Sequence, residues 1–115
     1  MFDNNYDRNN VFAKIIRGEL PCDKVAESEH AIAFRDIHPN APFHILVAPR
    51  GPYVNAYHFI RTASAAEQLD FWKLAADVAD MANADGFNGV MNTGKSHGQA
   101  VPHFHLHILS GKKLF

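Results

Sequence analysis

The chain has 115 residues, of which 47% are hydrophobic and 20% are charged, and its formal net charge is −1. A chain of this length and balance builds one small globular core and is too short for two. Its scattered lysines and arginines exclude a protein whose main task is to bind nucleic acid or an anionic membrane surface.

The cysteine count and the N-terminal composition bear on the compartment. Cys22 is the only cysteine, so the chain forms no internal disulfide. Residues 1–10 are polar, without the apolar core of a signal peptide, and no stretch is long enough to span a bilayer. We therefore expect a cytoplasmic protein with a flexible N-terminus over residues 1–10 and a single domain over residues 11–115.

The first half of the chain predicts one short helix and three strands. Asn10 can cap a helix over residues 11–17, whose apolar residues recur at helical spacing, and Gly18 favours a helix end. The strands are expected at residues 24–27, 31–36 and 43–48. Pro49 ends the third strand, and the proline-rich stretch before that strand predicts a turn.

The second half predicts one long helix and two further strands. Ser64 and Glu67 have the spacing of a capping box, and the helix that follows should run to about Ala84 and stop near Gly86. Its apolar stripe is expected to consist of Leu69, Trp72, Ala76, Val78 and Ala79. Residues 51–62 show no clear helix or strand pattern. Residues 89–93 predict a strand, and residues 93–101 a glycine-rich loop. The sum is an α+β fold, with a mostly antiparallel sheet of about five strands, one long helix and one short helix.

The most informative stretch is residues 103–109, where polar and apolar residues alternate as in a half-buried strand opened by Pro102. Such a strand should place three imidazoles on one face, each roughly 6.5 Å from the next. The histidines are His103, His105 and His107, and the residues expected to face the core are Phe104, Leu106 and Ile108. Three histidines on one face of a strand are not explained as solvated surface residues. We therefore expect a functional site here, with His44 of the third strand as a further candidate.

Residues 89–96 match the phosphate-binding P-loop pattern G-x-x-x-x-G-K-[ST]. A P-loop follows a strand and opens a helix, whose N-terminus supplies amides and a dipole. Here the strand residues lie inside the motif, and Gly98 and Pro102 follow too soon for a helix of useful length. We interpret the match as a coincidence, although a glycine-rich turn that offers amides to a phosphate in another fold stays open.

The histidines themselves have two chemical interpretations. A His-x-His strand with a third histidine such as His44 is a known zinc arrangement. Against zinc, three histidines on one strand spread over about 13 Å and cannot easily all reach one ion at about 2.1 Å. No cysteine pair and no acidic residue beside the strand support a metal site. Phosphoryl transfer is the other interpretation, because one neutral imidazole can attack phosphorus while its neighbours neutralise oxygens and protonate a leaving group.

The sequence resembles the histidine triad superfamily, and within it the Hint-like branch. The resemblance lies in His-x-His-x-His followed by two apolar residues, and upstream in FAKIIRGELP (residues 12–21) and AFRDIHPNAPFHILV (residues 33–47). It implies a HIT-like α+β fold and a homodimer. It also implies hydrolysis of purine nucleoside 5′-phosphoramidates, and sometimes of aminoacyl-AMP, through a covalent nucleotidyl-histidine. The implied ligand is a purine nucleoside monophosphate or phosphoramidate, with no metal or other cofactor.

The resemblance also implies roles for individual residues. His105 would attack the α-phosphorus, and the backbone carbonyl of His103 would accept from its ring and orient it. His107 and His44 would contact the phosphate oxygens and the departing amine, while Asp36 would hold the ribose hydroxyls. The residues implied for the base pocket are Phe12, Ile15, Phe34 and Ile37, and a core role is the alternative for the first three. Those implied for the phosphate side are Asn92, Gly98, Gln99 and Ala100.

The chain departs from the family pattern in three places. Ala100 stands where many relatives carry a serine that hydrogen-bonds near the leaving group. Asn10 and Ala13 stand where some relatives carry zinc-binding cysteines, and the tail after Gly111 lacks a longer tryptophan-containing ending. Ala100 keeps open a different function, that of a purine nucleotide-binding regulatory protein with little turnover. A metal-binding protein is the third interpretation.

Overall fold

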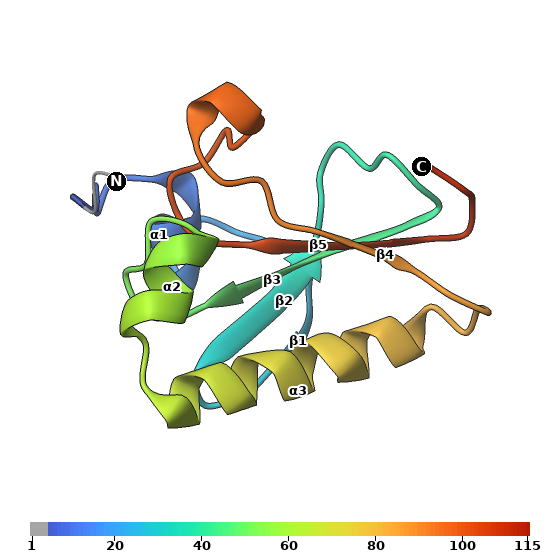
Figure 1. Cartoon of the computed structure of the whole chain (residues 1–115), viewed down its shortest axis with the longest axis horizontal. Helices are drawn as coiled ribbons and strands as arrows, with labels where there is room; N and C mark the ends of the chain where they lie inside the picture. Colours follow the sequence, from blue (N-terminus) through green and yellow to red (C-terminus); the bar gives the residue numbers. More distant parts are fainter. Residues whose placement is uncertain (1–4) are drawn as a thin grey trace.

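The computed structural model describes residues 5–115, which form a five-stranded antiparallel sheet with helices on both faces (Figure 1). The helices are α1 (Val11–Ile16), α2 (Ala56–Thr62) and α3 (Ala65–Met81), with a short 3₁₀ helix η1 (Lys95–His97). The strands are β1 (Lys24–Glu27), β2 (Ala31–Arg35), β3 (Phe43–Pro49), β4 (Asn88–Val90) and β5 (Leu106–Ser110). Their order in the sheet is β1-β2-β3-β5-β4. The predicted α+β class and five-stranded sheet are confirmed, and no helix of the described chain is both long and apolar enough to cross a membrane.

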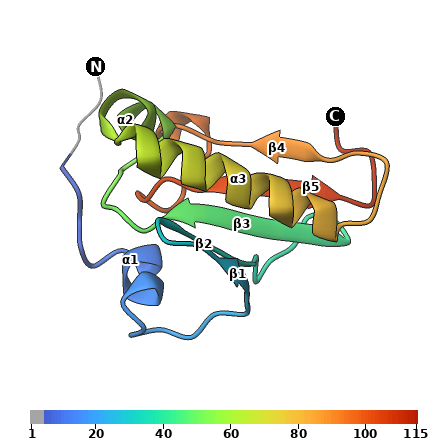
Figure 2. The ribbon, with the colours of Figure 1, turned by 90° about the horizontal axis from the view of Figure 1, so that it is seen from below.

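α2 and α3 lie on one side of the sheet and α1 on the other (Figure 2), and each face buries its own apolar cluster. α2 and α3 cover one face, where the rings of Phe59, Phe71 and Phe104 pack with centroids 5.1 to 5.2 Å apart. Each such pair contributes about 1 kcal/mol beyond its buried area. α1 covers part of the other face through Phe12, whose ring meets Phe34 edge-on at 5.3 Å. The histidine site lies on this second face, beside α1.

The first helix forms where the sequence predicts it and ends one residue earlier. The Asn10 side chain accepts from the amide of Ala13 at 2.9 Å, which satisfies one of the free amides of the first turn. Gly18 ends the helix with φ +79°, a left-handed conformation that glycine adopts without strain. The predicted flexible N-terminus differs from the structure at Asn10, which is buried and donates to the backbone oxygen of Asp7 at 2.8 Å. Residues 1–4 of that prediction lie outside the described residues.

α2 is a helix in the stretch that the sequence analysis leaves unassigned. Asn55 caps it by accepting from the amide of His58 at 2.8 Å. Its buried residues, Ala56 and Phe59, lie three apart on the side that meets the core. A helix of seven residues depends on packing for its stability, and periodicity over so short a length is weak. The sequence signal that could have predicted α2 is the cap residue Asn55 followed by the apolar positions Ala56 and Phe59.

α3 begins at the predicted capping box, in which Ser64 and Glu67 each accept from the other's backbone amide. It ends at Met81 rather than near Ala84, since Asn83 turns the chain with φ +49°. The predicted stripe is confirmed at Val78, which is buried, and at Ala79, which packs partly buried against the core, and is wrong at the other three positions. Leu69 is 59% exposed and Trp72 37% exposed, whereas the buried residues are Phe71, Leu74, Ala75 and Val78. The helix has apolar residues on two sides, and the sheet buries the side that starts at Phe71.

The histidine stretch is only partly a strand. β5 begins at Leu106, and residues 103–105 form an irregular segment before it. The amide of Phe104 donates to the backbone oxygen of Tyr53 at 2.8 Å and takes no part in the ladder with β3. The predicted even row of three imidazoles is therefore wrong, whereas Phe104, Leu106 and Ile108 face the core as predicted. Smaller differences concern the strands predicted at 31–36, 43–48 and 89–93, which occupy 31–35, 43–49 and 88–90.

Candidate active site

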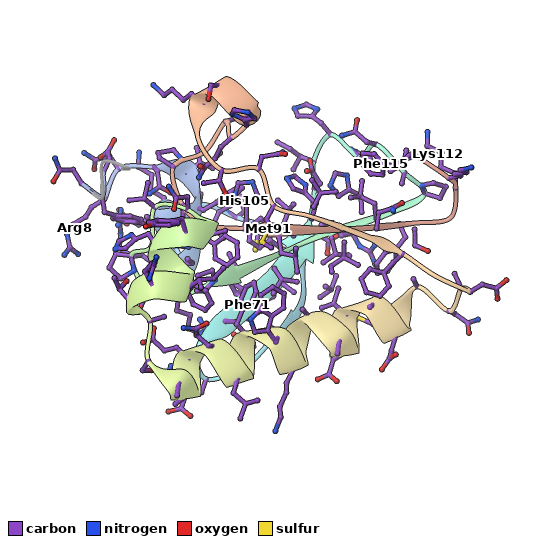
Figure 3. All side chains as sticks on the ribbon, viewed as in Figure 1. Arg8, Phe71, Met91, His105, Lys112 and Phe115 are labelled. Atoms are coloured by element: carbon purple, nitrogen blue, oxygen red, sulfur yellow. The ribbon has the colours of Figure 1, made fainter. Side chains whose placement is uncertain are left out.

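His105 lies just before β5, on the side of the sheet away from α3, whereas Phe71 lies between the sheet and that helix (Figure 3). Its Nδ1 is 2.7 Å from the carbonyl oxygen of His103. A carbonyl oxygen only accepts, so Nδ1 carries the ring proton and Nε2 keeps a lone pair. Burial lowers the pKa of His105, against the raising effects of this hydrogen bond and of Asp36. His105 is thus a neutral imidazole with a fixed tautomer and a nucleophilic Nε2.

His103 is fully buried, so its ring does not line the surface of a site. Its Nε2 donates to the carbonyl oxygen of Pro49 at 2.8 Å, and its Nδ1 accepts from the hydroxyl of Tyr6 at 2.5 Å. Burial lowers the pKa of His103 to about 4, with the bond to Pro49 opposing the shift and His105 adding to it. This geometry suits the expected role of orienting His105 through the backbone carbonyl and leaves the ring no contact with a ligand.

His44 and His107 extend from the neighbouring strands β3 and β5 and bond to each other. His44 Nε2 and His107 Nδ1 are 2.9 Å apart. The amide of Asn40 donates to His44 Nδ1 at 3.1 Å, so a neutral His44 carries its proton on Nε2 and donates it to His107. His107 then accepts at Nδ1, and its own ring proton sits on Nε2. The pair forms a directed chain that ends in a hydrogen-bond donor.

The same two histidines are held neutral by their surroundings. Burial lowers the pKa of His44, and Asp36 opposes that shift. Burial also lowers the pKa of His107, which the neighbouring His105 and His44 depress further, to about 4. An anionic group bound beside His107 would raise its pKa again, because an opposite charge favours the protonated form.

Asp36 completes this group at the end of β2. Its Oδ1 accepts from the amide of His38 at 2.8 Å, and its Oδ2 lies 3.4 Å from His44 Nε2 and 4.0 Å from His107 Nδ1. The Asp36 side chain is 18% exposed, whereas the Ile37 residue after it is 85% exposed. A carboxylate between the histidine pair and solvent can accept from hydroxyl groups of a ligand and can stabilise a protonated His107.

Asp36, His44 and His107 also offer one ligand atom each within 4.8 Å, a spacing that a metal ion can bridge. Their hydrogen bonds do not suit a metal. An ion binds the lone pair of a neutral imidazole, and the one lone pair of His44, on Nδ1, already accepts from Asn40. Metal binding at His44 Nε2 would require the loss of a second ring proton or of that hydrogen bond. We therefore interpret the group as a hydrogen-bond relay.

The loop between β4 and β5 is fixed by the side chain of Gln99. Its Oε1 accepts from the amide of Gly94 at 2.9 Å, and its Nε2 donates to the carbonyls of Val54 and Val101 at 2.7 and 3.0 Å. Both of its N–H groups are used inside the protein. Gln99, expected on the phosphate side, therefore contributes by shaping the loop rather than by donating to a ligand.

The other loop residues expected on the phosphate side lie around this fixed turn. Gly98 has φ +92° and packs on Asn92, whose Cγ would lie 3.6 Å from an added Cβ. Ala100 is exposed at the end of the loop. The P-loop look-alike, residues 89–96, leads only into η1, a 3₁₀ helix of three residues, so it lacks the helix that a P-loop needs.

Three of the four residues expected to form a base pocket, Phe12, Phe34 and Ile15, pack in one cluster, to which Ile37 does not belong. Phe12 and Phe34 are 8% and 3% exposed and belong to the core cluster on the α1 face. The Phe12 ring packs edge-on against the His105 ring, with the two centroids 4.8 Å apart, so Phe12 restricts the position of that imidazole. Ile15 is half-buried against the same cluster, and Ile37 is the most exposed of the four.

A cavity of about 300 Å³ opens beside the histidine pair. It is lined by Asn40, His44, Val90, Asn92, His107, Leu109, Leu114 and Phe115. The sequence analysis does not propose the apolar lining residues as site residues, because apolar side chains in strands and in a tail carry no sequence signal for a ligand site. These residues are Val90, Leu109, Leu114 and Phe115. Two larger hollows, around Gly86 and Phe87, are lined by none of the histidines. Of these three hollows, the smallest one is the hollow that His44 and His107 line.

Known proteins resemble this chain in sequence and in fold. A sequence model of the HIT domain matches residues 17–114. An uncharacterised HIT-like protein of Azospirillum brasilense is 48% identical over 95% of this chain and 91% of that protein, and the purine nucleoside phosphoramidase of Escherichia coli is 38% identical over 90% and 88%. A histidine triad protein from Clostridium difficile superimposes with a TM-score of 0.81 at 34% identity, covering 96% of this chain and 97% of that one. A HIT family hydrolase from Legionella pneumophila gives a TM-score of 0.84 at 31% identity, covering 93% and 96%.

Proposed function

The chain belongs to the HIT domain family, and from the arrangement of its histidines we propose that it hydrolyses purine nucleoside 5′-phosphoramidates. The observation that carries the proposal is the hydrogen bond from His105 Nδ1 to the carbonyl of His103, which leaves His105 Nε2 as a nucleophile. The relatives named as hydrolase and phosphoramidase support hydrolase activity. The name of the Escherichia coli relative supports the purine phosphoramidate, and aminoacyl-AMP is a further substrate of the same chemistry.

In the first step, the Nε2 lone pair of His105 forms a bond to the α-phosphorus and the P–N bond breaks. The departing nitrogen takes one proton and leaves as an amine. His107 is the donor. The bound phosphate raises its pKa, so its ring takes a second proton from solvent on Nδ1, which then faces Asp36 at 4.0 Å in place of the hydrogen bond from His44. His107 returns to its neutral form as it gives up the Nε2 proton.

In the second step, water attacks the phosphorus of the nucleotidyl-histidine and the bond to His105 Nε2 breaks. Neutral His107 takes a proton from the water, so the products are a nucleoside monophosphate and the original neutral His105. The ring proton of His105 stays on Nδ1, hydrogen-bonded to the carbonyl of His103, through both steps. That bond also favours the charged ring of the intermediate, because its positive charge strengthens the N–H donor.

The nucleoside part of the substrate meets Asp36 and the exposed residue beside it. We assign the ribose hydroxyls to the Asp36 carboxylate and the base to Ile37, which is 85% exposed, with half-buried Ile15 as a further contact. Asn92 and the backbone of residues 98–100 take the phosphate side. The apolar lining of the cavity beside His107 then receives the leaving group.

A second copy of the chain is part of this proposal. β4 is an edge strand, and the residues around it, Phe87 and Met91, are 53% and 42% exposed. An unpaired edge flanked by exposed apolar side chains favours pairing with another strand. We propose a homodimer that acts on small molecules rather than on nucleic acid or membrane, and a cytoplasmic location stays a prediction.

A nucleotide-binding regulatory protein with little turnover is the second candidate. The observation that favours it is Ala100, an exposed methyl in the loop beside the phosphate side, where a hydroxyl would help the leaving group. Turnover of a fluorogenic adenosine phosphoramidate, measured together with AMP titration, separates the two. We expect turnover, AMP binding and a protein mass increased by one nucleotidyl group after rapid quench. AMP binding without turnover would favour the regulatory protein, and neither activity would reject both candidates.

A further inference from the structure

Tyr6 precedes α1 and lies outside residues 17–114, which match the HIT domain, yet it contacts the first histidine of the triad. Its hydroxyl oxygen lies 2.5 Å from His103 Nδ1, and the two rings meet edge-on with centroids 5.6 Å apart. Burial raises the pKa of Tyr6, with smaller opposing effects from Asn10 and nearby arginines, so the phenol keeps its proton at neutral pH. Tyr6 is therefore a hydrogen-bond donor to His103.

The direction of this bond follows from the other edge of the same ring. His103 Nε2 must donate, because its partner is the carbonyl oxygen of Pro49. The lone pair of the ring is then on Nδ1, in a side chain with no exposed surface. A buried acceptor without a donor destabilises the arrangement that buries it, and the Tyr6 hydroxyl supplies that donor.

The segment that carries Tyr6 is itself fixed to α1. The Asn10 amide and its side-chain amide both donate to the backbone oxygen of Asp7, at 3.2 and 2.8 Å. The Arg17 guanidinium donates to the backbone oxygen of Arg8 at 2.8 Å. Tyr6 is thus presented to His103 from a closed turn at the start of the helix.

We propose that Tyr6 is a positioning residue for the nucleophile His105. Tyr6 and Pro49 hold opposite edges of the His103 ring and thereby fix the peptide unit whose carbonyl accepts the Nδ1 proton of His105. This peptide unit lies outside the β-ladder, since its own amide, that of Phe104, donates to the backbone oxygen of Tyr53 at 2.8 Å, and the preceding amide, that of His103, donates to Val101 at 2.9 Å. Without the hydroxyl, the His103 carbonyl shifts, and His105 populates the tautomer with its proton on Nε2, which cannot attack phosphorus.

The test compares Tyr6→Phe with Tyr53→Phe as the matched control. The Tyr53 variant also loses one partly buried hydroxyl bond, to Glu67 at 2.7 Å in the first turn of α3, whereas the backbone oxygen of Tyr53, which accepts from the amide of Phe104, is unchanged by the substitution. The kinetic part of the inference rests on the proposed function, whereas the tautomer part rests on the structure alone. The measurements are kcat and KM with the fluorogenic adenosine phosphoramidate, the melting temperature, and NMR spectra that distinguish protonated from unprotonated ring nitrogens.

For Tyr6→Phe we expect a fall in kcat of roughly tenfold with KM changed by less than about twofold, because the orientation of the nucleophile and not ligand binding is affected. The ring-nitrogen signals of His105 should move toward a mixture of tautomers. Tyr53→Phe should lower the melting temperature by a similar amount and leave kcat and the His105 signals unchanged.

Unchanged His105 signals in Tyr6→Phe, or equal kcat in the two variants, would overturn the proposal. If the wild-type protein shows no turnover, the proposed function fails and the NMR comparison alone decides the role of Tyr6. If Tyr6→Phe does not fold, the wild-type spectrum decides, because His103 Nδ1 must then give the signal of a hydrogen-bonded acceptor. A signal typical of an acceptor without a donor would contradict the inference.

Discussion

The four histidines of the site fall into two pairs with different partners. His103 and His105 lie in the irregular segment before β5, and each donates a ring proton to a backbone carbonyl, at 2.8 and 2.7 Å. His44 and His107 lie on paired strands, His44 Nε2 donates to His107 Nδ1 at 2.9 Å, and Asp36 lies beside both rings. The first pair has tautomers fixed by carbonyls that never donate. The second pair has partners that can gain or lose protons.

Histidine can act either as a nucleophile or as an acid–base catalyst, and the hydrogen-bond partners of each pair suit a different one of these two tasks. A nucleophile needs a lone pair that is always on the same nitrogen, which a carbonyl partner guarantees. An acid–base catalyst needs a proton that can leave and return, which a neighbouring imidazole and a carboxylate allow. In the proposed function, nucleophilic attack therefore falls to the His103–His105 pair and proton transfer to the His44–His107 pair.

The largest expected effect comes from the nucleophile. His105→Ala should lose several orders of magnitude in turnover, since the covalent route is removed outright, while AMP binding stays within a few-fold. Steady-state kinetics and AMP titration measure the two quantities. If the variant keeps more than about a tenth of the wild-type rate, His105 is not the nucleophile, and the role given to the His103–His105 pair is wrong.

A smaller and substrate-dependent effect is expected from the proton-transfer pair. His107→Ala should lose about 10²- to 10⁴-fold with an amine leaving group, because the departing nitrogen no longer receives a proton. A nitrophenyl ester, whose leaving group needs little protonation, should lose much less. The ratio of the two losses is the measurement, and equal losses would mean that His107 does not act on the leaving group.

The buried ring of His103 should also make the free energy of unfolding depend on pH. The pKa of His103 is about 4 in the folded protein and near 6.5 when unfolded, so the neutral ring stabilises the fold fully above about pH 6.5. Below that pH the unfolded chain binds more protons, and about 3 kcal/mol is lost as the pH falls toward 4. Denaturant unfolding at several pH values measures this loss. His103→Asn should weaken the pH dependence, and an unchanged slope in that variant would contradict the assignment.

The smallest effect concerns Ala100, three residues before the first triad histidine. Ala100→Ser adds a hydroxyl that can donate to the departing group, and one such bond is worth on the order of 1–3 kcal/mol, roughly ten- to a hundredfold in rate. Amine-leaving substrates should gain more than a nitrophenyl ester, and AMP affinity should change little. Equal gains, or no gain for the amine, would mean that Ala100 does not face the leaving group.

Local signals in the sequence were sufficient for part of the fold. The Asn10 cap, the Ser64–Glu67 capping box and the strand around His44 are set by short-range physics, and they are found where predicted. The exposed position of Trp72 could not be predicted in this way, because α3 has apolar residues on two sides and only the sheet selects between them.

The site shows the same limit. The alternating pattern correctly puts Phe104 in the core, yet it cannot reveal that the amide of Phe104 bonds to Tyr53 and takes His103 out of the strand. The contact between Tyr6 and His103 joins residues 97 positions apart and leaves no trace in local composition. Partners of this kind depend on the tertiary fold.

Residues near both ends of the described chain reach the same site. Tyr6 bonds to the buried His103, and Phe115 lines the cavity beside His107. An affinity tag ahead of Tyr6 or after Phe115 would therefore be joined within a few residues of the reacting groups. Kinetic constants should be compared between tagged and cleaved protein. A fluorescent label is better attached at the turn after α3, residues 83–86, which does not line the cavity beside His107.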